Sequence, residues 1–245
     1  MRKLFEDVPN VISFIDDIYC YSETSAEHLE TLETVFRTLQ DANLAAKPSK
    51  CCLGYQDLDF LGHSVGHGQL KADSTLLGKV QKSERPTTKQ EVRSFIGLVS
   101  YYRHFIPNCA EIAVPLTDLT RRGQPTKVRW GEAQERSFET LKSLLEKPPI
   151  LQLPDFDKVF VLRTDASDRG IGSILMQEKD GILHPVSYAS HKLLPREQNY
   201  SAIEREALAI VWAISKFDLY LFGRPFVIQT DHKPLVYIIK SQMCK

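Results

Sequence analysis

The sequence predicts a multidomain protein of the α/β and α+β classes, and three observations support that prediction. Residues 158–230 alternate between apolar runs typical of strands and one long amphipathic segment typical of a helix. Residues 86–146 contain amphipathic segments separated by prolines, which indicates a helical region. Residues 11–72 combine two hairpin patterns with one helix. A chain of 245 residues has room for two to three such domains.

Charge is distributed unevenly, although the net charge is zero. Residues 1–73 carry 6 Lys/Arg and 12 Asp/Glu, residues 74–150 carry 13 and 8, and residues 151–245 carry 12 and 11. Together with the change of pattern along the chain, this favours three domains, which we place at 1–72, 73–152 and 153–245. The basic middle segment has the charge to contact phosphate, whereas the simpler interpretation is a solvated helical surface.

Composition excludes several classes of protein. No apolar run approaches the ~20 residues of a membrane span, and no signal peptide opens the chain, so we expect no membrane association. The cysteines stand at positions 20, 51, 52, 109 and 244, without a CxxC pair. An odd count without paired spacing indicates reduced thiols and an intracellular protein of the cytoplasm or nucleus. The histidines show no zinc spacing.

The first region contains an unusual hairpin. In VISFIDDIYCYS, residues 11–22, Asp16 and Asp17 interrupt an apolar run and are expected at a turn. Burying two adjacent carboxylates is costly, so the pair must reach water or cations. Apolar residues at helical spacing then predict a helix from Ser25 to Leu44. Glycines within residues 51–72 predict a second short hairpin.

Helices are expected in the middle region. Thr88 and Glu91 have the spacing of a capping box, which predicts a helix that begins after Pro86. Another helix is expected over residues 132–146. The three prolines in residues 146–158 indicate a linker.

The last region alternates strands and helices. Strands are expected over 158–167, 170–177 and 182–189, which suggests a meander. A long helix is expected over 197–217 and a further strand over 225–230. A final helix is expected to begin near His232.

Acidic residues follow two of these strands directly, at Asp165 and Asp231. If the two strands are parallel neighbours, both acids lie at one edge of the sheet. The intervening helix offers Glu204 and Glu206 on opposite flanks of its apolar stripe, and periodicity cannot choose between them. Converging carboxylates without a cationic partner favour Mg²⁺. The simpler interpretation is a set of turn and cap residues on solvated surfaces.

Several motifs, taken in order, resemble the polymerase polyprotein of gypsy-type LTR retrotransposons. FIDDIYCYS resembles the catalytic hairpin of a reverse transcriptase, and KCCLGYQDLDFLGH resembles the segment that leads into its primer-gripping hairpin. RSFIGLVSYYRHFIPNCAEIAVPLTDL resembles the thumb and connection helices. RTDASDRGIGSILMQ, HPVSYASHKL, NYSAIEREALAIVWAI and FVIQTDHKPL resemble the RNase H domain. The resemblance extends from Val11 to Ile238, and it implies half of a polymerase palm, thumb and connection helices, and an RNase H-like domain with a mixed sheet.

The resemblance also implies an activity: DNA synthesis on an RNA template, and cleavage of RNA in RNA–DNA hybrids, each with two Mg²⁺ or Mn²⁺ ions. The implied partners are RNA–DNA hybrid, primer–template nucleic acid and deoxynucleotides, together with the rest of the polyprotein. The implied catalytic and metal-binding residues are Asp16, Asp17, Asp165, Glu206 and Asp231.

Five more residues gain an expected role from the resemblance. Gly62 and His63 are expected near the primer-gripping hairpin, and Lys50 at the position of a proton-donating lysine. Tyr102 and Arg103, in SYYRHF, are expected in a nucleic-acid groove, because grooves of this kind mix aromatic and basic side chains. The alternative is a helix with buried aromatic residues and a solvated arginine.

The chain departs from the family pattern at both ends. An upstream polymerase Asp, the fingers and half of the palm are absent, so we expect no polymerisation by this chain alone. A fourth RNase H acid is absent after Asp231, so we expect weak or no cleavage. Two further interpretations stay open: a non-catalytic module that binds nucleic acid, and a retroelement relic whose incomplete palm favours aggregation.

Overall fold

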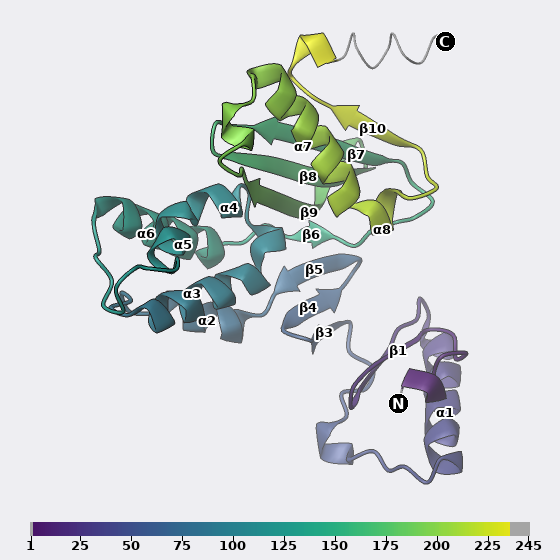
Figure 1. Cartoon of the computed structure of the whole chain (residues 1–245). Coiled ribbons are helices and arrows are strands. Elements are labelled where there is room, and N and C mark those ends of the chain that lie inside the picture. Colours follow the sequence, from purple (N-terminus) through teal and green to yellow (C-terminus); the bar gives the residue numbers. More distant parts are fainter. Residues whose placement is uncertain (1, 236–245) are drawn as a thin grey trace. The chain divides into compact units, whose positions relative to one another are not determined.

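The computed structural model describes residues 2–235 and divides into two compact units, Met1–His67 and Gly68–Lys245 (Figure 1). The mixture of helices and sheets confirms the predicted fold class. The predicted domain boundary at residue 72 lies close to this division, and the division into three domains stays a prediction. The predicted helix from His232 onward falls largely on residues outside the described part of the chain.

The first unit consists of two hairpins and a helix. Its elements are η1 (Arg2–Leu4), β1 (Val11–Phe14), β2 (Asp17–Cys20), α1 (Ser25–Asp41), η2 (Pro48–Lys50), β3 (Asp57–Phe60) and β4 (His63–Gly66). Both strand pairs are antiparallel, with Phe14 opposite Asp17 and Phe60 opposite His63. The Thr24 hydroxyl accepts a hydrogen bond from the Glu27 N–H and begins α1, as N-cap residues do.

The core of the first unit is small. Its buried side chains are Phe5, Val35 and Leu39. Large apolar residues remain on its surface, among them Leu29 on α1, which is 68% exposed, and Ile15, which is 72% exposed. The second unit therefore contains most of the buried apolar surface of the described chain.

The second unit begins with a helical region. Its elements are β5 (Gln69–Ala72), α2 (Ser74–Gln81), α3 (Lys89–Tyr101), η3 (Arg103–Phe105), α4 (Cys109–Ile112), α5 (Val114–Leu119), α6 (Glu132–Glu146) and β6 (Leu151–Gln152). Thr88 caps α3 as predicted, and the Glu91 carboxylate accepts from the Thr87 N–H. The predicted linker is wrong at β6, which pairs with β5 because fully buried Leu151 packs into the helical core.

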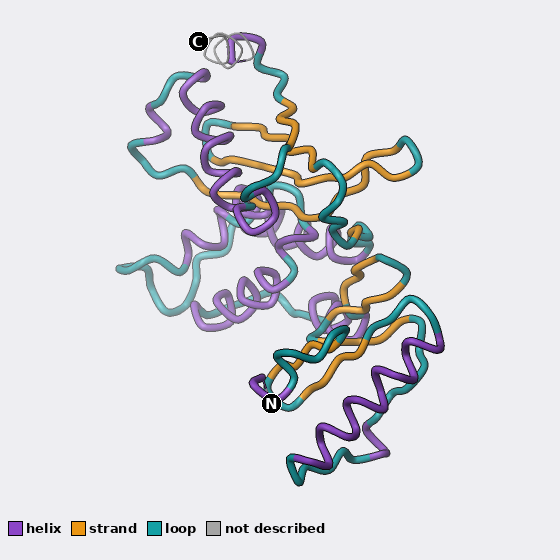
Figure 2. The backbone as a smooth tube through the Cα atoms, turned by 90° about the vertical axis from the view of Figure 1, so that its right-hand side faces the viewer, coloured by secondary structure: helices purple, strands orange, loops and turns teal. Residues whose placement is uncertain are grey.

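A four-stranded sheet follows in the same unit (Figure 2). Its elements are β7 (Phe160–Ala166), β8 (Gly170–Lys179), β9 (Ile182–Lys192), η4 (Glu197–Asn199), α7 (Ala202–Lys216), α8 (Asp218–Leu221) and β10 (Phe226–Gln229). The strand order is β10-β7-β8-β9. The predicted meander is confirmed by the antiparallel pairs β7–β8 and β8–β9, while β10 runs parallel to β7. Helix α7 packs on one face of this sheet through Ala209 and Ala213. Ile203 and Val211, which periodicity placed in its apolar stripe, are exposed, so the buried face of α7 is rotated toward Glu206.

The helical region and the sheet are joined by polar contacts. The Ala110 N–H, at the start of α4, donates to the Ser190 hydroxyl of β9 at 2.8 Å. The Lys192 ammonium lies 2.8 Å from Asp118, and Tyr188 packs against the helical core. These contacts explain why residues 68–235 form one compact unit.

Candidate functional site: an acidic edge of the sheet and an aspartate hairpin

Asp165 and Asp231 are brought to the same edge of the sheet by the pairing of β7 with β10. The strands are parallel, with Arg163 opposite Gln229, and each acid follows two residues beyond that pair. The Arg163 guanidinium donates to the Gln229 side chain at 2.9 Å and fixes the register on the exposed face. Two acids distant in sequence are therefore neighbours because the strands that precede them pair in parallel, the arrangement that the sequence analysis considered.

Glu206 of α7 completes the acidic edge. Its side chain is only 8% exposed, and its Oε1 accepts a hydrogen bond from the Ala166 N–H at 3.3 Å. Its Oε2 is buried without a hydrogen-bond partner. Burial raises the pKa of Glu206, and the charges of Asp165 and Asp231 raise it further. Glu206 is thus a buried acid whose charged form is disfavoured by burial and by two other acids.

Glu204 has a different task. It accepts hydrogen bonds from the backbone N–H and the hydroxyl of Ser201 at 2.8 Å, which completes a capping box at the start of α7. These hydrogen bonds lower the pKa of Glu204. The two glutamates that periodicity could not separate are therefore separated by their contacts.

The residues of the acidic edge suit a hard divalent cation. A buried carboxylate oxygen without a donor is costly, and a cation offsets both this cost and the repulsion between the acids. Within residues 2–235, however, no three His, Cys, Asp or Glu side chains stand close enough to enclose a metal as they lie. The acids thus provide the right ligand chemistry without a closed coordination cage.

Two neighbours of the acids were not anticipated from the sequence. The Arg205 guanidinium donates to the Ser167 carbonyl at 3.3 Å and ties α7 to the turn after β7. The Nδ1 of His232 is buried without a partner, and the charge of this ring opposes the rise in the pKa of Glu206. In the sequence, only their positions next to Glu206 and Asp231 could have indicated that Arg205 and His232 lie near the acids.

In the first unit, Asp16 and Asp17 lie at the tip of the β1–β2 hairpin, as predicted, and both are exposed. Ile15 precedes them with φ 53, a left-handed conformation that is rare for a β-branched residue. Such strain often accompanies a functional turn.

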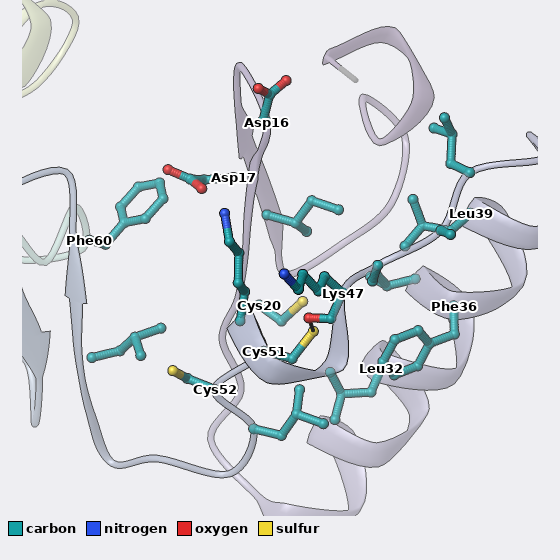
Figure 3. Close-up of a pocket in the computed structure, with 18 of the residues that line it drawn as sticks. Asp16, Asp17, Cys20, Leu32, Phe36, Leu39, Lys47, Cys51, Cys52 and Phe60 are labelled. Atoms are coloured by element: carbon teal, nitrogen blue, oxygen red, sulfur yellow. Dashed lines mark hydrogen bonds between the residues drawn. The ribbon is translucent and has the colours of Figure 1, made fainter.

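A cavity of about 570 Å³ lies beside this hairpin. Figure 3 shows Asp16 at the hairpin tip, away from Leu32 and Phe36, which form part of the apolar wall. Lys47 and Lys50 line the same cavity. The cavity thus places two carboxylates and two ammonium groups around an apolar floor.

Gly62 and His63 occupy the turn and the start of β4. Leu61 and Gly62 both have positive φ, which is the geometry of a two-residue type I′ hairpin turn. The Nδ1 of His63 lies 2.8 Å from the Leu61 carbonyl. Their expected proximity to a primer stays a prediction.

The structure corrects the expectation for Tyr102. Its side chain is fully buried in the helical core, and burial raises its pKa to about 12. It therefore cannot stack on a base from the surface. Arg103 is exposed, and the preceding Tyr101 is 44% exposed at the end of α3. The motif alternates buried and exposed positions, as the alternative interpretation of a helix with buried aromatic residues and a solvated arginine predicted.

The fold and the two acidic sites define a reverse transcriptase unit followed by an RNase H-like domain. A family model described as reverse transcriptase (RNA-dependent DNA polymerase) matches residues 1–65. A second, described as the RNase H-like domain found in reverse transcriptase, matches residues 130–228.

The chain belongs to the family of gypsy-type retrotransposon Pol polyproteins. It is 43% identical over 225 residues to the Pol polyprotein of transposon 297 of Drosophila melanogaster, which covers 92% of this chain and 21% of that protein. It is 38% identical over 240 residues to that of transposon gypsy from the same organism, covering 94% and 23%. The chain thus spans about a fifth of the length of these relatives.

A solved structure shares the fold. The foamy viral protease–reverse transcriptase in complex with double-stranded DNA matches with a TM-score of 0.85 and 27% identity, over 96% of this chain and 42% of that one. The same viral enzyme in complex with an RNA/DNA hybrid matches with a TM-score of 0.81 and 28% identity, over 93% and 31%. None of the described helices has the length and apolarity to cross a membrane.

Proposed function

We propose that the sheet of the second unit cleaves the RNA strand of RNA–DNA hybrids with divalent metal ions, Mg²⁺ or Mn²⁺. The observation that carries this proposal is the environment of Glu206, whose buried Oε2 lacks a hydrogen-bond partner and whose pKa is raised by burial and by the charges of Asp165 and Asp231. The relatives and the hybrid-bound viral structure support the choice of substrate.

Each acid has a stated part in the reaction. Asp165, Glu206 and Asp231 would hold the ions, which when bound activate a water and stabilise the leaving oxygen of a phosphodiester. Oε1 of Glu206 is held by the Ala166 N–H, and Oε2 has no hydrogen-bond partner and would be free to bind an ion. Arg205 holds the turn that follows Asp165 and limits the movement of that strand end.

We further propose that Asp16 and Asp17 supply carboxylates for DNA synthesis in the parent polyprotein, with primer–template nucleic acid and deoxynucleotides as partners. Their exposure at a strained hairpin tip supports this role, because exposed carboxylates can reach a cation and the phosphates of a nucleotide. Mn²⁺ affinity should fall when both are changed to Asn and should not change with Asp41→Asn, an exposed acid at the end of α1.

Cleavage of a labelled RNA–DNA hybrid tests the main proposal. Cleavage of the RNA strand by the full chain with Mn²⁺ or Mg²⁺ is expected to be weak, as the sequence analysis predicts, and Asp165→Asn should abolish it. Asp168→Asn is the matched control, since Asp168 is an exposed acid on the same turn. Cleavage that survives Asp165→Asn would refute the assignment.

The second candidate function is binding of the hybrid without turnover. The absence of a closed cluster of three ligands within the described residues favours it. Tight binding of hybrid by wild type and Asp165→Asn alike, with no cleavage by either, would select this function.

A further inference from the structure

We infer that the connection between α5 and α6 is a binding surface for the phosphate backbone of nucleic acid. This basic loop, residues 120–129, contains Arg121, Arg122, Lys127 and Arg129 and no acidic residue. The inference rests on the proposed function, because it takes an RNA–DNA hybrid as the ligand. The inference is that the hybrid contacts the basic loop in addition to the acidic edge.

The basic loop is fastened to the start of α3. The Lys89 ammonium donates to the carbonyls of Arg121 and Gln124, at 3.0 and 2.5 Å. The Arg93 guanidinium donates to the Thr120 carbonyl at 3.2 Å. These two cations are therefore used to fix the loop, which lowers the entropy cost of placing its own charges against a ligand.

Backbone pairing decides which side chains of the loop face solvent. The Lys89 N–H donates to the Thr126 carbonyl and the Val128 N–H to the Thr87 carbonyl, both at 2.9 Å. Val128 packs against the helical core. Because side chains alternate along extended backbone, Lys127 and Arg129 lie together on the opposite, exposed side.

Most side-chain charges of the basic loop are not neutralised by the described residues. Arg121 pairs with Asp118 at 3.0 Å. By contrast, no described residue forms an ion pair or hydrogen bond with the side chains of Arg122, Lys127 or Arg129. All three are exposed. Three uncompensated cations on a fixed loop favour a polyanion, which releases its counterions on binding.

Nucleic acid is the polyanion that the molecule favours. The same compact unit contains the RNase H-like sheet, and the viral structures that share its fold are bound to RNA/DNA hybrid and to double-stranded DNA. The charge excess of residues 74–150, which the sequence left as either a phosphate site or a solvated surface, is then partly explained by this loop.

The test measures binding of an RNA–DNA hybrid to the full chain by fluorescence anisotropy, in EDTA and over a range of salt concentrations. The triple variant Arg122→Ala/Lys127→Ala/Arg129→Ala should weaken binding by about tenfold and lower the salt slope by roughly one per lost phosphate contact. The control, Lys147→Ala/Lys179→Ala/Lys216→Ala, removes the same charge from three other exposed positions. It should change neither quantity beyond a small fraction of this effect.

Two results with hybrid would overturn the inference: no binding by the wild-type chain, or equal weakening by both triple variants. A third concerns polyglutamate, a polyanion without phosphate: the inference also fails if the loop variant loses binding to polyglutamate but not to hybrid. Equal melting temperatures of the two variants would exclude misfolding as the cause. Because EDTA prevents cleavage, this measurement is independent of the proposed nuclease activity. A chain that binds hybrid through the loop but never cleaves it would refute the nuclease proposal alone.

Discussion

Glu206 accepts a hydrogen bond from the Ala166 N–H at 3.3 Å, so α7 is fastened to the residue that directly follows Asp165. One oxygen of the carboxylate is thereby used for structure, and the other is left buried without a donor. Glu206 thus fastens α7 to β7, while the burial of its other oxygen is unfavourable for the metal-free fold.

This conflict predicts the pH dependence of stability. Because the pKa of Glu206 is raised in the folded state, that state binds more protons between the ordinary and the raised value. The free energy of unfolding should therefore fall as pH rises through this window. Without metal, Glu206→Gln should melt at a higher temperature than wild type at pH 7, and the difference should disappear in acid.

Glu204→Gln is the matched control for that experiment. Its carboxylate has a lowered pKa because Ser201 donates to it, so it stabilises the fold above its ordinary pKa and loses that effect as pH falls. Glu204→Gln should not raise the melting temperature at pH 7. A Glu206→Gln protein that is less stable than wild type at every pH would contradict an unfavourable burial of the charged Glu206 carboxylate.

Arg205 should act as a positioning residue for the acidic edge. Arg205→Ala removes the hydrogen bond to the Ser167 carbonyl and should weaken Mn²⁺ binding by about tenfold, as loss of outer-shell contacts does. Arg205→Lys should restore most of the affinity, since an ammonium can reach the same carbonyl. Calorimetry measures both, and equal loss in the two variants would argue against a positioning role.

Gly172 of β8 should be intolerant of a side chain. A Cβ there would overlap the side chain of Asn108, which precedes α4. Gly172→Ala should cost about 1–3 kcal/mol by overpacking the junction between the helical region and the sheet. Gly97→Ala is the control: a Cβ at this position of α3 meets nothing within 4 Å, and stability should rise by about 0.5–1 kcal/mol. Chemical denaturation distinguishes the two, and equal stabilities would contradict this account.

Alanine variants of Tyr101 and Tyr102 should differ in their effects, because one ring is exposed and the other is buried. Tyr102→Ala should cost about 3–5 kcal/mol, because the ring is fully buried. Tyr101→Ala should cost under about 1 kcal/mol and weaken binding of hybrid. Denaturation and anisotropy measure the two effects. Hybrid binding unchanged in Tyr101→Ala would remove this residue from the nucleic-acid surface.

The sequence predicted those features that depend on local pattern. The caps at Thr88 and the strands that lead to Asp165 and Asp231 follow from spacing and composition, and the structure confirms them. The resemblance chose Glu206 over Glu204, and in the structure Ser201 binds Glu204 at the helix start while Glu206 is among the buried residues of α7. Periodicity does not contain that information.

Other features depend on tertiary packing. Leu151 lies in a proline-rich segment that resembles a linker, yet it becomes a buried strand residue because it pairs with Leu70 of β5, 81 residues earlier. Tyr102 follows Tyr101 in one motif, and only the direction of α3 relative to its core decides which ring is exposed. Arg205 and His232 had no signal beyond their adjacency to the acids.

Binding of Mn²⁺ alone to the full chain is the direct test of the proposed metal site, because it needs neither substrate nor turnover. Wild type should bind Mn²⁺ at the acidic edge, and Asp165→Asn and Glu206→Gln should each weaken that binding by about tenfold or more. Asp168→Asn should bind as wild type does. Equal Mn²⁺ affinity in all four proteins would contradict a metal site formed by Asp165, Glu206 and Asp231.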